Sequence, residues 1–289
     1  TSKFNRTISL TTTDPYFTQD GISRTLNVYS TTTRPYYTID GDYRLVNEGG
    51  SIRFGVPFSE VDTVFFGAGL ERFKFDPGSN VAIPTPQAYQ DFFGCTPDAT
   101  TKLVTCAKSS VWGLPLTIGW ARDDRDSALV PSSGRLQRAN VELGVAGDLR
   151  YAKTSYQYQQ YFPLSKQYTL ALNGEVGYGK ASSGYAFPVF KNFYAGGLGS
   201  IRGFEQNSLG PRDRVTQAAL GGTKKAIFNA ELSTPFPGAG NDRTLRLYGF
   251  FDAGNVFSDS YAGQTPAQVK GQKMIRASTG IGISWVSPL

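Results

Sequence analysis

The feature that most constrains this chain is a succession of strand-length segments in which apolar and polar residues alternate. In residues 273–287, Ile275, Ile281 and Trp285 fall on one face, while Arg276 and Ser278 fall on the other. Turn signals built from Gly, Pro, Asn and Asp separate the segments. The pattern predicts about eleven strands: 3–13, 21–31, 50–58, 62–74, 110–122, 134–147, 149–163, 167–180, 224–236, 243–258 and 273–287.

The connections between these segments alternate between short and long. Tight turns such as 59–62 and 163–166 close one set of hairpins. The other set is joined mostly by longer stretches, apart from the short junction near Gly147-Asp148; these stretches are 32–49, 75–109, 181–223 and 259–272. Short turns at one rim and long loops at the other are typical of an up-and-down barrel in an outer membrane, so the long connections are expected to face outward.

Aromatic residues bracket the apolar rows. In 109–122 a single row begins at Trp112, continues through Leu116 and Ile118, and ends at Trp120. A soluble β-sandwich also alternates, but its strands are usually about 5–6 residues long. Segments of nine to sixteen residues with aromatic ends favour an all-β, antiparallel transmembrane barrel with lipid on the outside and a polar lumen.

Composition agrees with a single all-β unit. Among 289 residues there are 33 Gly, 20 Phe and 16 Tyr, but one Met and no His, and no domain linker interrupts the chain. No window offers the roughly 18 apolar residues of a spanning helix, and no charged-then-apolar leader opens the sequence. The formal charge of +6 is scattered, so nucleic acid is not expected as a partner.

A glycine-rich stretch at 196–204 contains four glycines within eight residues, around one arginine and one phenylalanine. Such a run is often a flexible surface loop. Two predicted strands follow it, and their apolar rows, Phe228–Leu232 and Leu245–Ala253, leave Glu231 and Asp252 on the lumen face. The residues proposed for the loop motif are Gly196, Gly197, Ile201, Arg202, Gly203 and Phe204.

Two neighbouring carboxylates could serve acid–base catalysis or a metal ion. The sequence has no His, no convincing nucleophile and no phosphate-binding motif to complete such a site, so we expect no enzyme activity, metal or cofactor. A carboxylate pair without those partners needs a cation, and the guanidinium of Arg202 suits bidentate pairing. We therefore predict that Arg202 docks the loop in the lumen against Glu231 and Asp252.

Several of these motifs together resemble the BamA family of outer-membrane protein assembly factors. The matching stretches are Phe190–Gly197, Ile201-Arg202-Gly203-Phe204, Leu209-Gly210-Pro211, Ala230-Glu231-Leu232, Phe251-Asp252-Ala253-Gly254, Asp14-Pro15-Tyr16-Phe17 and Ser284–Leu289. The resemblance implies a bacterial outer-membrane protein that folds and inserts β-barrel clients without a cofactor. Its implied partners are outer-membrane lipid, unfolded client proteins and accessory assembly lipoproteins, and its implied loop partners in the lumen are Glu231, Asp252 and Gly254.

The same resemblance implies a longer barrel. Family members carry POTRA domains before a sixteen-stranded barrel, so residues 1–289 would be a partial barrel domain without those domains, the first three strands and the last two. The seam between first and last strands, which the family is thought to open to template incoming strands, would then lie outside the chain. The alternative functions are a secretion transporter of the same superfamily, exporting a dedicated partner, and a passive porin.

Cys95 and Cys106 are the only cysteines. Their spacing does not decide between two free thiols and a disulfide that closes a small ring. With no other Cys and no His they cannot form a zinc site. The oxidising compartment implied by the family resemblance favours a Cys95–Cys106 disulfide in an external loop. We expect such a bond to brace the loop rather than to act in redox chemistry.

Overall fold

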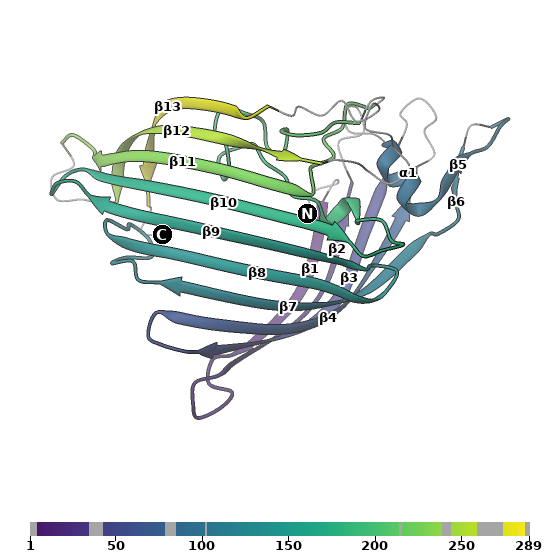
Figure 1. Cartoon of the computed structure of the whole chain (residues 1–289), viewed down its shortest axis with the longest axis horizontal. Coiled ribbons are helices and arrows are strands. Elements are labelled where there is room, and N and C mark those ends of the chain that lie inside the picture. Colours follow the sequence, from purple (N-terminus) through teal and green to yellow (C-terminus); the bar gives the residue numbers. More distant parts are fainter. Residues whose placement is uncertain are drawn as a thin grey trace.

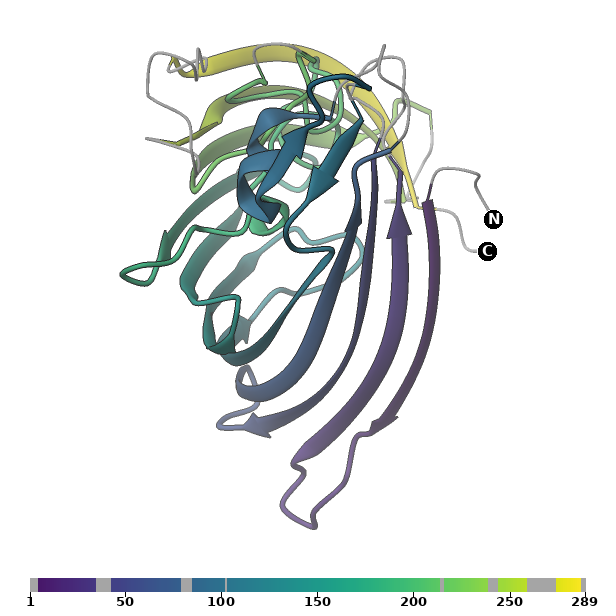
Figure 2. The same ribbon diagram turned by 90° about the vertical axis from the view of Figure 1, so that its right-hand side faces the viewer.

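An eleven-stranded antiparallel sheet forms the body of the protein in a computed structural model, which describes residues 5–34, 43–78, 85–101, 103–213, 216–238, 244–258 and 274–286. Consecutive strands pair from β1 to β13, and the sheet curves into a deep trough (Figures 1 and 2). Its strands are β1 (Asn5–Asp14), β2 (Ser23–Thr33), β3 (Arg44–Pro57), β4 (Asp62–Asp76), β7 (Ser110–Asp123), β8 (Gly134–Gly147), β9 (Tyr151–Pro163), β10 (Thr169–Ala181), β11 (Lys224–Pro235), β12 (Leu245–Phe257) and β13 (Arg276–Trp285).

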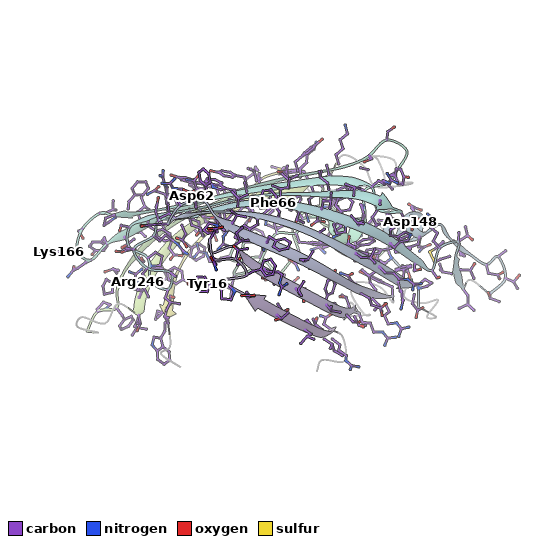
Figure 3. The ribbon with its side chains drawn as sticks, turned by 90° about the horizontal axis from the view of Figure 1, so that it is seen from below. Tyr16, Asp62, Phe66, Asp148, Lys166 and Arg246 are labelled. Atoms are coloured by element: carbon purple, nitrogen blue, oxygen red, sulfur yellow. A yellow bond between two sulfur atoms is a disulfide. The ribbon has the colours of Figure 1, made fainter. Side chains whose placement is uncertain are left out.

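The predicted number and order of strands are confirmed. Within the described ranges β1 pairs only with β2 and β13 only with β12, so the sheet is open. The short turns lie at one end of the strands and the long connections at the other, where Figure 3 labels Lys166 and Asp148 respectively. Parts of the predicted connections 32–49 and 259–272, and residues 287–289, lie outside the described residues.

The third strand was predicted too short. Residues 44–49, assigned to a connection, continue β3 and pair with both neighbours: Gly49 lies opposite Tyr29 of β2 and Glu71 of β4. The Gly49-Gly50 pair looks like a turn in the sequence. In the structure a Cβ on Gly49 would lie 2.7 Å from the Tyr29 hydroxyl, so this glycine makes room for a ring inside the strand.

Two long connections contain structure that the sequence did not predict. Between β4 and β7 lie helix α1 (Gln87–Phe93) and the ribbon β5 (Cys95–Pro97) with β6 (Val104–Cys106), at the rim of the long connections in Figure 1. The Cys95–Cys106 disulfide that the family resemblance implied is present and joins the two strands of this ribbon. The connection 182–223 contains the short 3-10 helix η1 (Val189–Lys191).

The outer face of the sheet is apolar and exposed. Ile118, Val176 and Ile281 expose 51%, 54% and 84% of their surface, which a protein in water would bury. Side chains project from both faces of the sheet in Figure 3. The exposed outer rows are those expected from the alternation, including Trp112, Leu116, Val141, Val145, Tyr168, Tyr178, Phe228, Leu232, Phe251, Ile275, Ile283 and Trp285.

Two buried clusters fill part of the concave side. The larger contains Phe73, Phe75 and Phe93 and connects α1 and β5 to β4, β7 and β9. The smaller contains Phe193, Ile201 and Val256 and connects the 182–223 loop to β11 and β12. In the described part of the chain, no helix has the length and apolar character needed to cross a membrane.

Replacing an outward apolar residue by a charge tests the assignment of the faces. We expect Val176→Arg, in the middle of β10, to lower the free energy of unfolding in lipid by about 2–4 kcal/mol because the charge faces hydrocarbon. Leu164→Arg is the control, since Leu164 is equally exposed but lies in the turn after β9. Urea titration of protein refolded into vesicles measures both, and equal losses would contradict the assignment.

Candidate functional site

The loop tip, residues 196–204, lies against the concave faces of β11, β12 and β13. Gly196 and Gly197 are buried and take left-handed φ values of 108° and 92°, which few other residues adopt. Ile201 is fully buried, Gly203 also has a positive φ of 83°, and Phe204 packs against the smaller cluster. The glycine-rich stretch is therefore a folded element on the wall of the trough.

Arg202 makes the central contacts of the loop tip. Its Nε lies 2.7 Å from Asp252 Oδ2 and its Nη2 2.8 Å from Asp252 Oδ1, a bidentate pair. Its backbone amide donates to Asp252 Oδ2 at 2.9 Å, and Nη1 donates to Glu231 Oε2 at 2.5 Å. The side chain of Asp252 is 0% exposed and is paired with Arg202, and Asn229 contributes a further side-chain hydrogen bond to it.

Four further side chains hold the loop tip, and sequence reasoning did not single them out as part of the site. The guanidinium lies 3.9 Å from the centre of the Phe250 ring and 5.5 Å from that of Tyr248. Ser278 of β13 donates to the Arg202 carbonyl oxygen at 2.5 Å, and Asn229 donates to the Ser200 carbonyl oxygen at 2.7 Å. All four lie on the inward faces that the alternation defines, which is the signal that could have found them.

Gly254 makes room for the loop tip. A Cβ at this position would lie 2.8 Å from the Cα of Ile227 and 3.1 Å from Cδ1 of Ile201. It would also collide with the Ala226 carbonyl oxygen. The absence of a side chain on Gly254 therefore lets Ile201 enter its pocket beside Val256.

The electrostatics of the site keep Arg202 charged. The hydrogen bonds donated to Asp252 raise the pKa of Arg202, and those to Glu231 add to this, while burial opposes them. Over the described ranges, no group of three or more His, Cys, Asp or Glu side chains could hold a metal ion. What this arrangement can do is fix a loop at a defined place in the lumen.

The comparisons with known proteins agree with this architecture. The model of a family described as the Omp85 superfamily domain matches residues 1–289. The chain belongs to the Omp85 superfamily. Its relatives include the outer membrane protein assembly factor BamA of Neisseria meningitidis, 36% identical over 97% of this chain, and the human sorting and assembly machinery component 50 homolog, 30% identical over 56% of it.

Two solved structures show a similar fold. BamA from Haemophilus ducreyi lacking POTRA domains 1–3 superposes over 99% of this chain with a TM-score of 0.83 at 22% identity, and CdiB from Acinetobacter baumannii reaches 0.53 at 14% identity. The chain spans 37% of the length of the Neisseria relative and 57% of the Haemophilus chain. The predicted all-β barrel fold and location in the bacterial outer membrane are thereby confirmed.

A charge-swap cycle tests the pairing of Arg202 with Asp252. We expect Arg202→Glu to lower stability by up to about 3–5 kcal/mol, because it places a third carboxylate beside Glu231 and the buried Asp252. Thermal or urea unfolding measures the loss. Asp252→Arg in the double variant should restore part of it, whereas strictly additive losses would contradict direct pairing.

A pair of glycine substitutions tests the close approach at Gly254. Gly254→Ala should destabilise the protein by about 1–3 kcal/mol, because its Cβ would collide with the β11 backbone at Ala226 and Ile227 and crowd Ile201. Gly174→Ala in β10 is the matched control, because a Cβ there would meet nothing within 4 Å. Equal losses of stability in unfolding experiments on the two variants would contradict the close approach at Gly254.

Proposed function

We propose that this chain is the membrane-embedded part of an assembly factor that folds and inserts β-barrel proteins into the bacterial outer membrane, using the lumen-docked loop. The observation that carries the proposal is the 36% identity to the Neisseria assembly factor across 97% of the chain. The proposed partners are outer-membrane lipid, unfolded barrel clients and accessory assembly lipoproteins. In the proposed function the protein is not an enzyme and uses no nucleotide or cofactor.

The energetics of barrel insertion support such a mechanism. A client gains free energy by burying its apolar face in lipid and by pairing its strands, so the factor needs to lower only the kinetic barrier. A rigid wall with a fixed internal loop suits that task, since it presents a defined surface. We propose that Arg202 positions the loop through Asp252 and Glu231, with Ile201, Gly203, Phe204 and Gly254 shaping the contact.

A secretion transporter of the same superfamily is the second candidate, as the resemblance of the sequence motifs implies. A transporter would pass an unfolded partner through the lumen, whereas an assembly factor would release its client into the bilayer. A passive porin would instead need an open pore, and the 182–223 loop occupies part of the concave side. The three functions therefore differ in the final location of the substrate.

Reconstitution of the intact protein in vesicles separates these candidates. A urea-unfolded eight-stranded barrel is added outside the vesicles, and its folding is followed by the gel-mobility shift of folded barrels. We expect client folding at least about tenfold faster than in empty vesicles, with Arg202→Glu reducing that gain because the loop is released.

The same vesicles report the alternatives. Protease-protected, unfolded client in the vesicle interior would favour a transporter, and swelling in sugar solutions would favour a porin. No acceleration of client folding, with the protein itself folded in the vesicles, would contradict the proposed function. A variant outside the loop, Leu164→Arg, controls for damage by an added charge.

A further inference from the structure

The root of the same loop, residues 187–193, is held by a second charge cluster. Lys191, at the end of η1, places its Nζ 2.9 Å from Glu71 Oε2 of β4 and 2.9 Å from Glu142 Oε1 of β8. The side chain of Glu71 is 5% exposed and that of Lys191 is 16% exposed. The Tyr151 hydroxyl donates to Glu142 and lies 3.5 Å from Glu71 Oε1, so it contacts both carboxylates that bind Lys191.

The neighbours of Lys191 are also fixed to the wall. Lys153 of β9 donates to the Lys191 carbonyl oxygen at 2.7 Å, and its Nζ lies 4.4 Å from the centre of the Phe193 ring. Phe193 exchanges two backbone hydrogen bonds of 2.8 Å with Gly222, which precedes β11. The loop root is therefore bound through side chains and backbone together.

Two glycines of β10 receive the aromatic rings of the loop root. A Cβ on Gly177 would lie 2.7 Å from the Phe193 ring, and one on Gly179 would lie 2.6 Å from the Phe187 ring. Both glycines are on the inward face, opposite to Val176 and Tyr178. Side chains at these positions would displace the rings, so the strand surface is shaped to the loop.

The two sets of partners do not overlap. Arg202 binds carboxylates of β11 and β12, whereas Lys191 binds carboxylates of β4 and β8, on the other side of β9 and β10 in the sheet order. Burial alone would lower the pKa of Lys191, but Glu142 and Glu71 raise it, so the ammonium stays charged. The two ion-paired attachments therefore share no charged partner, although Phe193 of the root and Ile201 of the tip pack in the same buried cluster.

We propose that Lys191 is a positioning residue that fixes the loop root to β4 and β8 independently of Arg202, making the loop a strut between two walls of the trough. This inference deepens the proposed function, since it concerns how the loop is held. It predicts that either end of the loop can be released while the other stays docked.

Segment-resolved hydrogen exchange of the intact protein in detergent or vesicles tests this independence. Lys191→Met should speed amide exchange in 187–193 by at least about tenfold, because it removes the cation paired with the buried Glu71 and the partly buried Glu142, and should leave 200–204 protected. Arg202→Met should do the reverse. Lys180→Met is the matched control, since Lys180 is an exposed lysine of the neighbouring strand β10, and it should change neither segment.

Two more variants guard against general unfolding. Lys191→Arg should keep the loop root protected, and Glu71→Gln with Glu142→Gln should restore part of the protection lost in Lys191→Met by removing the unpaired charges. Opening of both segments in either single variant, or unchanged exchange in Lys191→Met, would overturn the proposal. The readout does not involve client folding, so it can fail or succeed separately from the proposed assembly function.

Discussion

The buried carboxylate of Asp252 is the constraint on which the described lumen depends. An ionised side chain with no exposed surface is costly unless a cation and hydrogen-bond donors surround it. Arg202 supplies three of those donors, two from the guanidinium and one from the backbone amide. The glycine-rich turn, the pocket for Ile201 and the missing side chain of Gly254 all serve to bring this one cation to β12.

Arginine suits this position better than lysine would. Its planar group binds Asp252 along one edge, reaches Glu231 with a third nitrogen and lies over the Phe250 ring. A lysine ammonium could not make the bidentate contact and the ring contact in the same geometry. The guanidinium of Arg202 is therefore held in a fixed orientation, which an ammonium group would not be. This orientation fixes the direction of the loop as well as its location.

The sequence predicted the strands and their faces because alternation is a local property that each segment carries by itself. The inward placement of Glu231 and Asp252 follows from Phe228, Leu232 and Phe251 on the outer rows, all of which are exposed. The sequence did not predict the early start of β3 because the Gly49-Gly50 pair suggests a turn. In the structure Gly49 lies within the strand and leaves space for the Tyr29 ring of β2. That the chain is part of a longer barrel with POTRA domains stays a prediction.

The partners of Lys191 could not be predicted in the same way. Glu71 and Glu142 lie on strands far from it in the chain, and only the curvature of the sheet brings them to one place. The same holds for α1 and the β5–β6 ribbon, whose short segments pack through Phe93 and Phe75 rather than through a visible period. The structure of these regions is determined by long-range packing and not by local sequence preference.

Three of the four carboxylates that bind the loop lie at the same number of residues from the ends of their strands. Glu71, Glu142 and Asp252 each lie five residues before the end of their strand, on the rim of the long connections. The loop tip bound there lines a pocket on the concave side together with the polar wall side chains Gln157, Gln159, Asn173 and Tyr161. The two ion-paired attachments therefore hold the loop beside a hydrogen-bonding surface of the wall rather than against an apolar one.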